Sequence, residues 1–150
     1  MKRIFAFVCT VFMISILAIP ASAAQTDGII SSKSYTLDNG IEIIDELILH
    51  SYTRSSTKDY TLRRSFSKSS TTIAVIAIYG DFKYDGNTVS VVSKSVSQTD
   101  TYDGWSYSQS SFSSSGGSIT LNAKLTKLLN ASIPITMTLS CDADGNISYS

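Results

Sequence analysis

The clearest alternation of apolar and polar residues lies near the end of the chain. Apolar side chains occupy every second position from Ile119 to Leu125, and again from Ile133 to Leu139. A period of two residues places these side chains on one face of a strand, so each segment is predicted to form a half-buried antiparallel strand. Cys141 falls on the apolar phase of the second segment, and we expect its thiol to point into the core.

A continuous apolar run, residues 73–79, predicts a strand that is covered on both faces. Its β-branched and aromatic residues favour a strand over a helix. Gly80 ends the run and indicates a bulge or a close approach of the backbone. The dipeptide Asp85-Gly86 is typical of a type I′ turn, so a second strand from Thr88 is predicted to complete a β-hairpin.

The segment 41–49 fits two periodicities. Its apolar residues alternate as in a strand, but Asp45 interrupts the apolar face, and helical spacing fits almost as well. We favour the strand because Asn39-Gly40, a hairpin turn signal, precedes it and because its β-branched content is high.

Shorter strands are predicted at residues 60–66 and from residue 105 onward, and a change of phase within residues 89–96 predicts a second bulge. The serine- and glycine-rich residues 108–118 are interpreted as a flexible loop or a sheet edge. Six to eight short strands with almost no helical segment favour one all-β domain, an antiparallel β-sandwich of immunoglobulin-like type. A small β-barrel is the alternative.

The first 23 residues are identified as a secretory signal peptide. Two basic residues precede an apolar stretch, residues 4–19, and residues 21–23 (Ala-Ser-Ala) match a signal peptidase site. The alternative is an uncleaved membrane anchor, but the stretch is shorter than the roughly 20 residues that span a bilayer. We therefore expect secretion, with a flexible N-terminus at residues 24–34 and a β-sandwich domain at residues 35–150.

Charge and cysteine content narrow the partners of the mature domain. The chain has 12 basic and 12 acidic residues, and the signal peptide takes two of the basic ones, so the mature domain is slightly acidic. This balance argues against a nucleic-acid or anionic-membrane partner after signal cleavage. Only Cys141 remains after cleavage, so the domain is expected to depend on its core without an internal disulfide.

Catalytic groups are sparse. Cys141 and His50, the only histidine, are the one candidate nucleophile and base, but a thiol in a core phase is unlike a reactive thiolate. The adjacent acids Asp45 and Glu46 point to opposite faces of a strand, which does not suit glycosidase chemistry. We therefore expect that the protein is not an enzyme, and a thiol-dependent enzyme is the weakest alternative.

Metal binding has one candidate site. Asp142, Asp144 and Asn146 match the opening of a calcium loop, but no acidic residue completes the twelve-residue loop, and hairpin turns use the same residues. One cysteine and one histidine do not make a zinc site. We expect no metal and no cofactor.

Two groups of residues are candidates for binding. Arg63 and Arg64 belong to a basic and aromatic stretch that is suited to an anionic wall polymer or glycan. Their alternative role is to protect a sheet edge against aggregation. Trp105 and Tyr107 could stack on a sugar ring, whereas a sandwich often uses a tryptophan as part of its core.

The chain resembles a group of functionally uncharacterised, small secreted proteins of Gram-positive, largely gut-dwelling bacteria. The resemblance covers residues 35–150 and is carried by residues 82–87, 104–106, 116–117 and 139–148. It implies a bacterial secreted β-domain and no known activity. The leading hypothesis is a non-enzymatic domain that contacts the cell envelope or extracellular glycans; the alternative is a secreted effector or inhibitor that acts on a protein partner.

Overall fold

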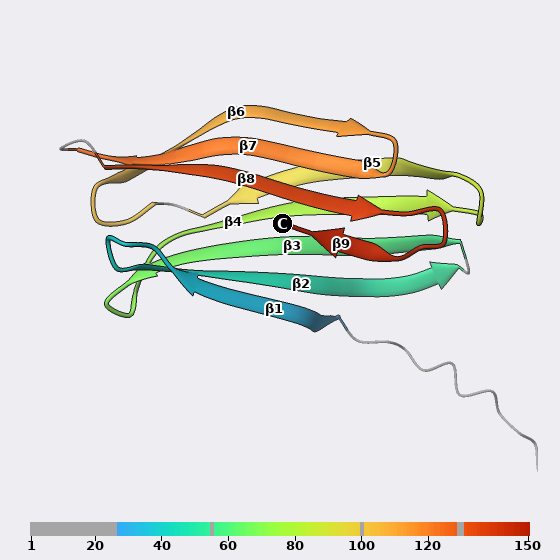
Figure 1. Ribbon diagram of the computed structural model, residues 1–150, viewed down its shortest axis with the longest axis horizontal. Helices are drawn as coiled ribbons and strands as arrows, with labels where there is room; N and C mark the ends of the chain where they lie inside the picture. Colours follow the sequence, from blue (N-terminus) through green and yellow to red (C-terminus); the bar gives the residue numbers. More distant parts are fainter. Residues whose placement is uncertain (1–26, 55, 100, 129–130) are drawn as a thin grey trace, which may run out of the picture.

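The computed structural model contains only strands, turns and loops in the residues that it describes, which are 27–54, 56–99, 101–128 and 131–150 (Figure 1). The predicted signal peptide, residues 1–23, lies outside them. Nine strands are described: β1 (Gly28–Thr36), β2 (Ile41–Arg54), β3 (Thr57–Lys68), β4 (Thr71–Tyr84), β5 (Val89–Gln98), β6 (Trp105–Ser115), β7 (Ser118–Lys127), β8 (Ala131–Cys141) and β9 (Ile147–Tyr149). The predicted all-β class is confirmed.

The strands form two antiparallel sheets that pack as a sandwich. One sheet has the order β1-β2-β3-β4-β5 and the other has the order β6-β7-β8-β9. Neighbours in each sheet are consecutive in the sequence, so both sheets are meanders, as expected where short turns join successive strands. An immunoglobulin-like domain needs Greek-key connections between its sheets. Among the described strands that connectivity is not observed, so the sandwich is confirmed and its immunoglobulin-like type is not.

The core lies between the inner faces of the two sheets. Its fully buried side chains include Leu62 and Ile76 from the five-stranded sheet, and Leu121 and Met137 from the four-stranded sheet. Gly80 marks a close approach of the two layers, because a Cβ atom there would lie 2.5 Å from Ile119 Cδ1. This confirms the close approach predicted at Gly80.

The hairpin predicted at β4 and β5 is present, but its turn differs from the prediction. A type I′ turn needs two residues with positive φ. Of the turn residues Asp85 and Gly86, only Gly86 has a positive φ, 86°. The Asp85 carboxylate instead accepts hydrogen bonds from the backbone amides of Asn87 and Thr88, at 3.0 and 2.7 Å, and thereby holds a longer loop.

Two further expectations can be compared with the strand register. The bulge predicted in β5 is confirmed at Val92, because Asp81 pairs with Ser93 whereas Phe82 pairs with Val91. Residues 28–34, expected to be a flexible terminus, instead belong to β1 and pair with β2. A backbone ladder holds this edge strand without a buried side-chain face, which explains why its polar sequence gave no strand signal.

Candidate functional site

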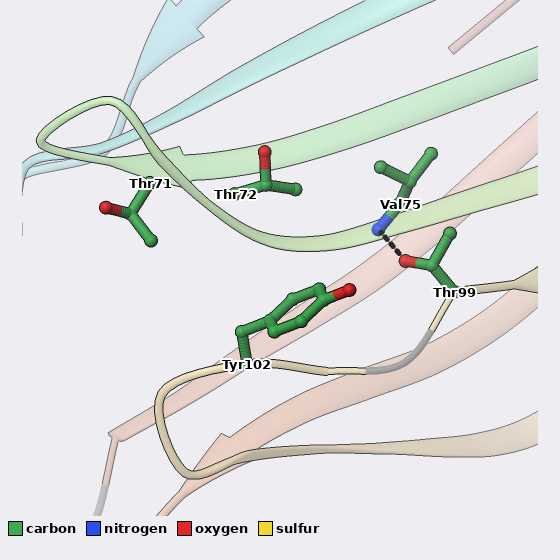
Figure 2. A pocket seen from close by; sticks show the side chains of 5 residues that line it. All are labelled: Thr71, Thr72, Val75, Thr99 and Tyr102. Atoms are coloured by element: carbon green, nitrogen blue, oxygen red, sulfur yellow. Dashed lines mark hydrogen bonds between the residues drawn. The ribbon is translucent and has the colours of Figure 1, made fainter.

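A pocket of about 440 Å³ lies where β4 begins and where the chain passes from β5 to β6. It is lined by Thr71, Thr72, Val75, Thr99 and Tyr102 (Figure 2). The first three residues belong to β4, and the last two belong to the connection between the sheets. The pocket is open to solvent, and its volume falls within the range of small-molecule sites.

The backbone around Tyr102 is anchored to β4. The amide of Thr99 donates to the carbonyl of Val75 at 2.9 Å, and the amide of Tyr102 donates to the carbonyl of Ile73 at 3.0 Å. The Thr99 hydroxyl also accepts from the amide of Val75 at 3.0 Å (Figure 2). The connection is thus positioned by hydrogen bonds, whereas Tyr102 itself remains 54 % exposed.

The lining of the pocket combines an aromatic ring with hydroxyl groups and carries no ionisable group except the phenol. In Figure 2 the ring of Tyr102 lies beside β4, facing the segment that carries Thr72 and Val75. An aromatic side chain offers an apolar face together with a polar tip. Three threonine hydroxyls nearby can each donate and accept a hydrogen bond. This arrangement suits an uncharged ligand that has both an apolar face and hydroxyl groups.

The predicted sugar-stacking residues lie elsewhere. Trp105 is only 7 % exposed and packs in the core, which agrees with its alternative role. Tyr107 lies opposite Leu125 on the inner face of β6, half-buried, and its hydroxyl oxygen has no hydrogen-bond partner among the described residues. Burial raises the pKa of Tyr107. Within residues 102–107 the exposed aromatic residue is Tyr102. It lies before β6 begins, so it is not one of the strand positions that face the core.

Arg63 and Arg64 do not form one basic surface, because adjacent residues of a strand point to opposite faces. Arg63 lies on the outer face of the five-stranded sheet, where it pairs with Glu46, its Nη2 2.7 Å from Oε2. Arg64 points into the sandwich and is 7 % exposed. The prediction of Arg64 as a surface contact is therefore corrected.

The guanidinium of Arg64 forms a buried ion pair. Its Nε and Nη2 donate to the two carboxylate oxygens of Asp45, at 2.5 and 2.7 Å, and its Nη1 donates to the carbonyl of Thr136 in the other sheet at 2.9 Å. Burial opposes the charge of Arg64, but the hydrogen bond and the charge of Asp45 raise its pKa overall. The prediction that residues 41–49 form a strand is confirmed, because they belong to β2. Asp45 interrupts the apolar face of this strand because it is the partner of Arg64.

Two acidic residues lie side by side on the outer face of the five-stranded sheet, outside the pocket. Asp59 and Asp81 are direct cross-strand partners on β3 and β4. Burial, followed by the hydrogen bond and the charge of Asp59, raises the pKa of Asp81. Burial, followed by the charges of both acids, also raises the pKa of neighbouring Tyr79. The sequence contains no local signal for this pair, because register brings together residues that are far apart in the chain.

The candidate thiol and base are not brought together. Cys141 lies on the inner face of β8 and is 5 % exposed, whereas His50 lies on the outer face of the other sheet and contacts Thr61, with Nε2 2.7 Å from the hydroxyl. The five-stranded sheet therefore separates them. Burial, and next the charge of Asp142, raises the pKa of Cys141, which disfavours a thiolate.

The calcium-like sequence forms a capped turn. Oδ1 of Asp142 accepts hydrogen bonds from the amides of Asp144 and Asn146, at 2.9 and 2.8 Å, and Oδ2 accepts from Asn146 Nδ2 at 2.9 Å. These bonds lower the pKa of Asp142. Among the residues that the structure describes, no group of three or more histidine, cysteine or acidic side chains is arranged to hold a metal ion.

No family model, curated protein or solved structure matches the chain. Within the described part of the chain, no helix is long and apolar enough to cross a membrane.

Proposed function

We propose that this protein is a secreted, non-enzymatic binding domain that contacts extracellular or cell-envelope glycans through the pocket at Tyr102. The observation that supports this proposal is the exposed Tyr102 ring, held beside threonine hydroxyls in an open pocket. A pyranose ring presents an apolar face to an aromatic side chain and hydroxyl groups around its edge. The pocket offers the complementary groups at both places.

A protein partner, the alternative, has less support. Stable protein interfaces bury roughly 800 Å² on each partner and usually centre on clustered aromatic and apolar residues. In the described part of the chain, the large apolar residues that are exposed are divided between two strands and two connections: Ile29, Ile30 and Tyr35 on β1, Val92 on β5, and Tyr102 and Leu128 in connections. This division favours a small ligand over one large effector surface.

The test compares Tyr102→Ala with Tyr35→Ala, which removes a comparably exposed ring from β1. Affinity for a panel of soluble wall and matrix oligosaccharides is measured by isothermal titration calorimetry. Loss of a stacking ring is expected to weaken binding about tenfold in Tyr102→Ala. Tyr35→Ala should bind as the wild type does, and Tyr102→Trp should restore binding.

Equal affinity of Tyr102→Ala and wild type would remove the pocket from the proposal. If the wild-type domain binds no glycan in the panel, the proposed function is wrong, and the search should turn to a protein partner.

A further inference from the structure

The outer face of the four-stranded sheet is almost free of charge. Its outward positions are the even-numbered residues of β7 and β8, together with the β6 residues that pair with those of β7. Except for Lys124 and Pro134, every one of these positions is serine, threonine or asparagine. We call this surface the hydroxyl face.

Hydrogen bonds order the hydroxyl face in rows that run across the strands. In one row, Asn122 Nδ2 donates to the hydroxyl of Ser111 at 3.0 Å, and the hydroxyl of Thr136 donates to Asn122 Oδ1, also at 3.0 Å. In another row, the hydroxyls of Ser118 and Ser140 are hydrogen-bonded to each other. Strand spacing places neighbours within a row about 4.8 Å apart and successive rows about 6.7 Å apart.

The opposite face of the molecule differs in chemistry. The outer face of the five-stranded sheet carries the Glu46–Arg63 ion pair and the Asp59–Asp81 pair. Charged side chains are the usual means of solubility on a protein surface. Solubility alone therefore does not account for the difference between the two faces.

The composition of the hydroxyl face selects among possible partners. One lysine is too little charge for nucleic acid or an anionic polymer. Protein interfaces, including those between two copies of a chain, are depleted in serine and are rich in aromatic residues, methionine and arginine. An uncharged array of groups that both donate and accept hydrogen bonds is complementary to a partner of the same kind, namely a polymer dense in hydroxyl groups.

We propose that the hydroxyl face binds the surface of a neutral polysaccharide. This inference rests on the proposed glycan function and specifies its ligand as uncharged and polymeric. The pocket is lined by the first residues of β4 and by the β5–β6 connection. Figure 1 shows that β6 begins at this same end of the molecule, so the hydroxyl face starts beside the elements that carry the pocket. The pocket at Tyr102 would hold the end of a polysaccharide chain, and the hydroxyl face would contact the surface of the polymer. These are separate contacts, and different substitutions remove them.

The test measures retention of the mature protein on insoluble neutral polysaccharides (cellulose, chitin and starch) and on a polyuronate gel. Wild type is expected to sediment with at least one neutral polymer and not with the polyuronate gel. About 1 M sodium chloride should leave retention on the neutral polymer unchanged, because the contact does not depend on exposed charges. Thr136→Lys places a charge in the middle of the face and should lower the affinity about tenfold. Ser113 lies on the exposed edge strand β6, and its side chain makes no hydrogen bond to another described residue. Ser113→Lys should therefore lower the affinity in the same way without breaking a hydrogen bond of the face.

The matched control is Ser97→Lys, which adds the same charge to an exposed position on the outer face of the other sheet. If Ser97→Lys reduces retention as much as Thr136→Lys and Ser113→Lys, or if none of the three does, the hydroxyl face is not the contact and the inference is wrong. Failure of wild type to bind any neutral polymer also overturns it.

The same variants distinguish the proposed function of the pocket from the proposal for the hydroxyl face. If Tyr102→Ala loses soluble oligosaccharides while the two lysine variants keep wild-type retention on the polymers, the pocket proposal stands and the hydroxyl face proposal falls. If the lysine variants alone lose retention, and Tyr102→Ala binds oligosaccharides as wild type does, the face stands and the pocket falls.

Discussion

At the scale of single residues, the pairs Asp45–Arg64 and Glu46–Arg63 join the same two strands on successive rungs of the ladder. Strand alternation sends one pair into the core and the other to the surface. Their geometries are similar, but their solvation is not: the side chain of Arg64 is 9 % exposed and that of Arg63 is 41 % exposed. The two pairs therefore allow burial to be tested within one sheet.

We expect Arg64→Ala to lower the free energy of unfolding by about 3–5 kcal/mol, because it leaves the Asp45 carboxylate buried without its partner. Arg63→Ala should cost at most about 1 kcal/mol, since water solvates the released Glu46. Urea denaturation followed by fluorescence measures both. Similar losses in the two variants would contradict the burial of Arg64.

The raised pKa of Asp81 makes the stability of the protein depend on pH. Because its pKa is raised in the folded state, the folded protein keeps this proton to higher pH than the unfolded chain does. The resulting stabilisation is complete below the pKa of the unfolded carboxyl group and is lost as the pH rises through the folded pKa. At neutral pH the ionised carboxylate of Asp81, which is partly desolvated and lies beside Asp59, therefore opposes folding.

Asp81→Asn removes this titration. The variant should be more stable than wild type at pH 7, and its advantage should shrink as the pH falls to that of an ordinary carboxyl pKa, about 4. Thermal unfolding across this range measures the difference. Asp85→Asn is the control with the opposite sign, because backbone hydrogen bonds from Thr88 and Asn87 lower the pKa of Asp85 and stabilise its charge. An advantage of Asp81→Asn that is constant with pH would contradict the interpretation.

At the scale of strands, the regular alternation in β7 and β8 was sufficient to predict which side chains face the core. It placed Cys141 on the inner phase, and the structure confirms this position. The free thiol should therefore react with 5,5′-dithiobis(2-nitrobenzoic acid) only when the protein unfolds. The absorbance of the thionitrobenzoate that the reaction releases, compared in buffer and in urea, measures this difference. Rapid reaction of the folded protein would contradict the burial of Cys141 and would favour the thiol-enzyme hypothesis.

Other elements show what a single sequence does not reveal. β1 is held mainly by a backbone ladder at a sheet edge, so its side chains carry no periodic signal. The turn at Asp85 depends on side-chain capping, which the dipeptide Asp85-Gly86 does not distinguish from a type I′ turn. The complementary charges of residues 45–46 and 63–64 did contain a signal, because alternation implies that one arginine faces each way.

The candidate site was harder to predict than the fold for the same reason. Its residues come from β4 and from the β5–β6 connection, and only their meeting across about 30 positions makes a pocket. The aromatic content of residues 102–107 indicated the right stretch. It did not show that Trp105 would enter the core and that Tyr102 would remain outside, because that choice depends on where β6 begins.

At the scale of the whole molecule, each sheet is a continuous half of the chain. Residues 28–98 form one layer and residues 105–149 form the other, so the covalent link between the layers is the connection that carries Tyr102 (Figure 1). Each layer has a nearly continuous apolar inner face that only the other layer covers. Neither half can therefore remove its apolar surface from water alone.

This arrangement predicts reassembly of a split protein. Fragments 24–100 and 101–150, expressed separately, should each lack the near-ultraviolet circular dichroism of an ordered tertiary structure. When they are mixed, the signal of Trp105 should return, because this residue packs between the layers. The complex should be less stable than the intact chain and should gain stability with concentration, since association is now bimolecular. An ordered spectrum from either fragment alone would show that one sheet suffices, and would contradict a core that the two layers share.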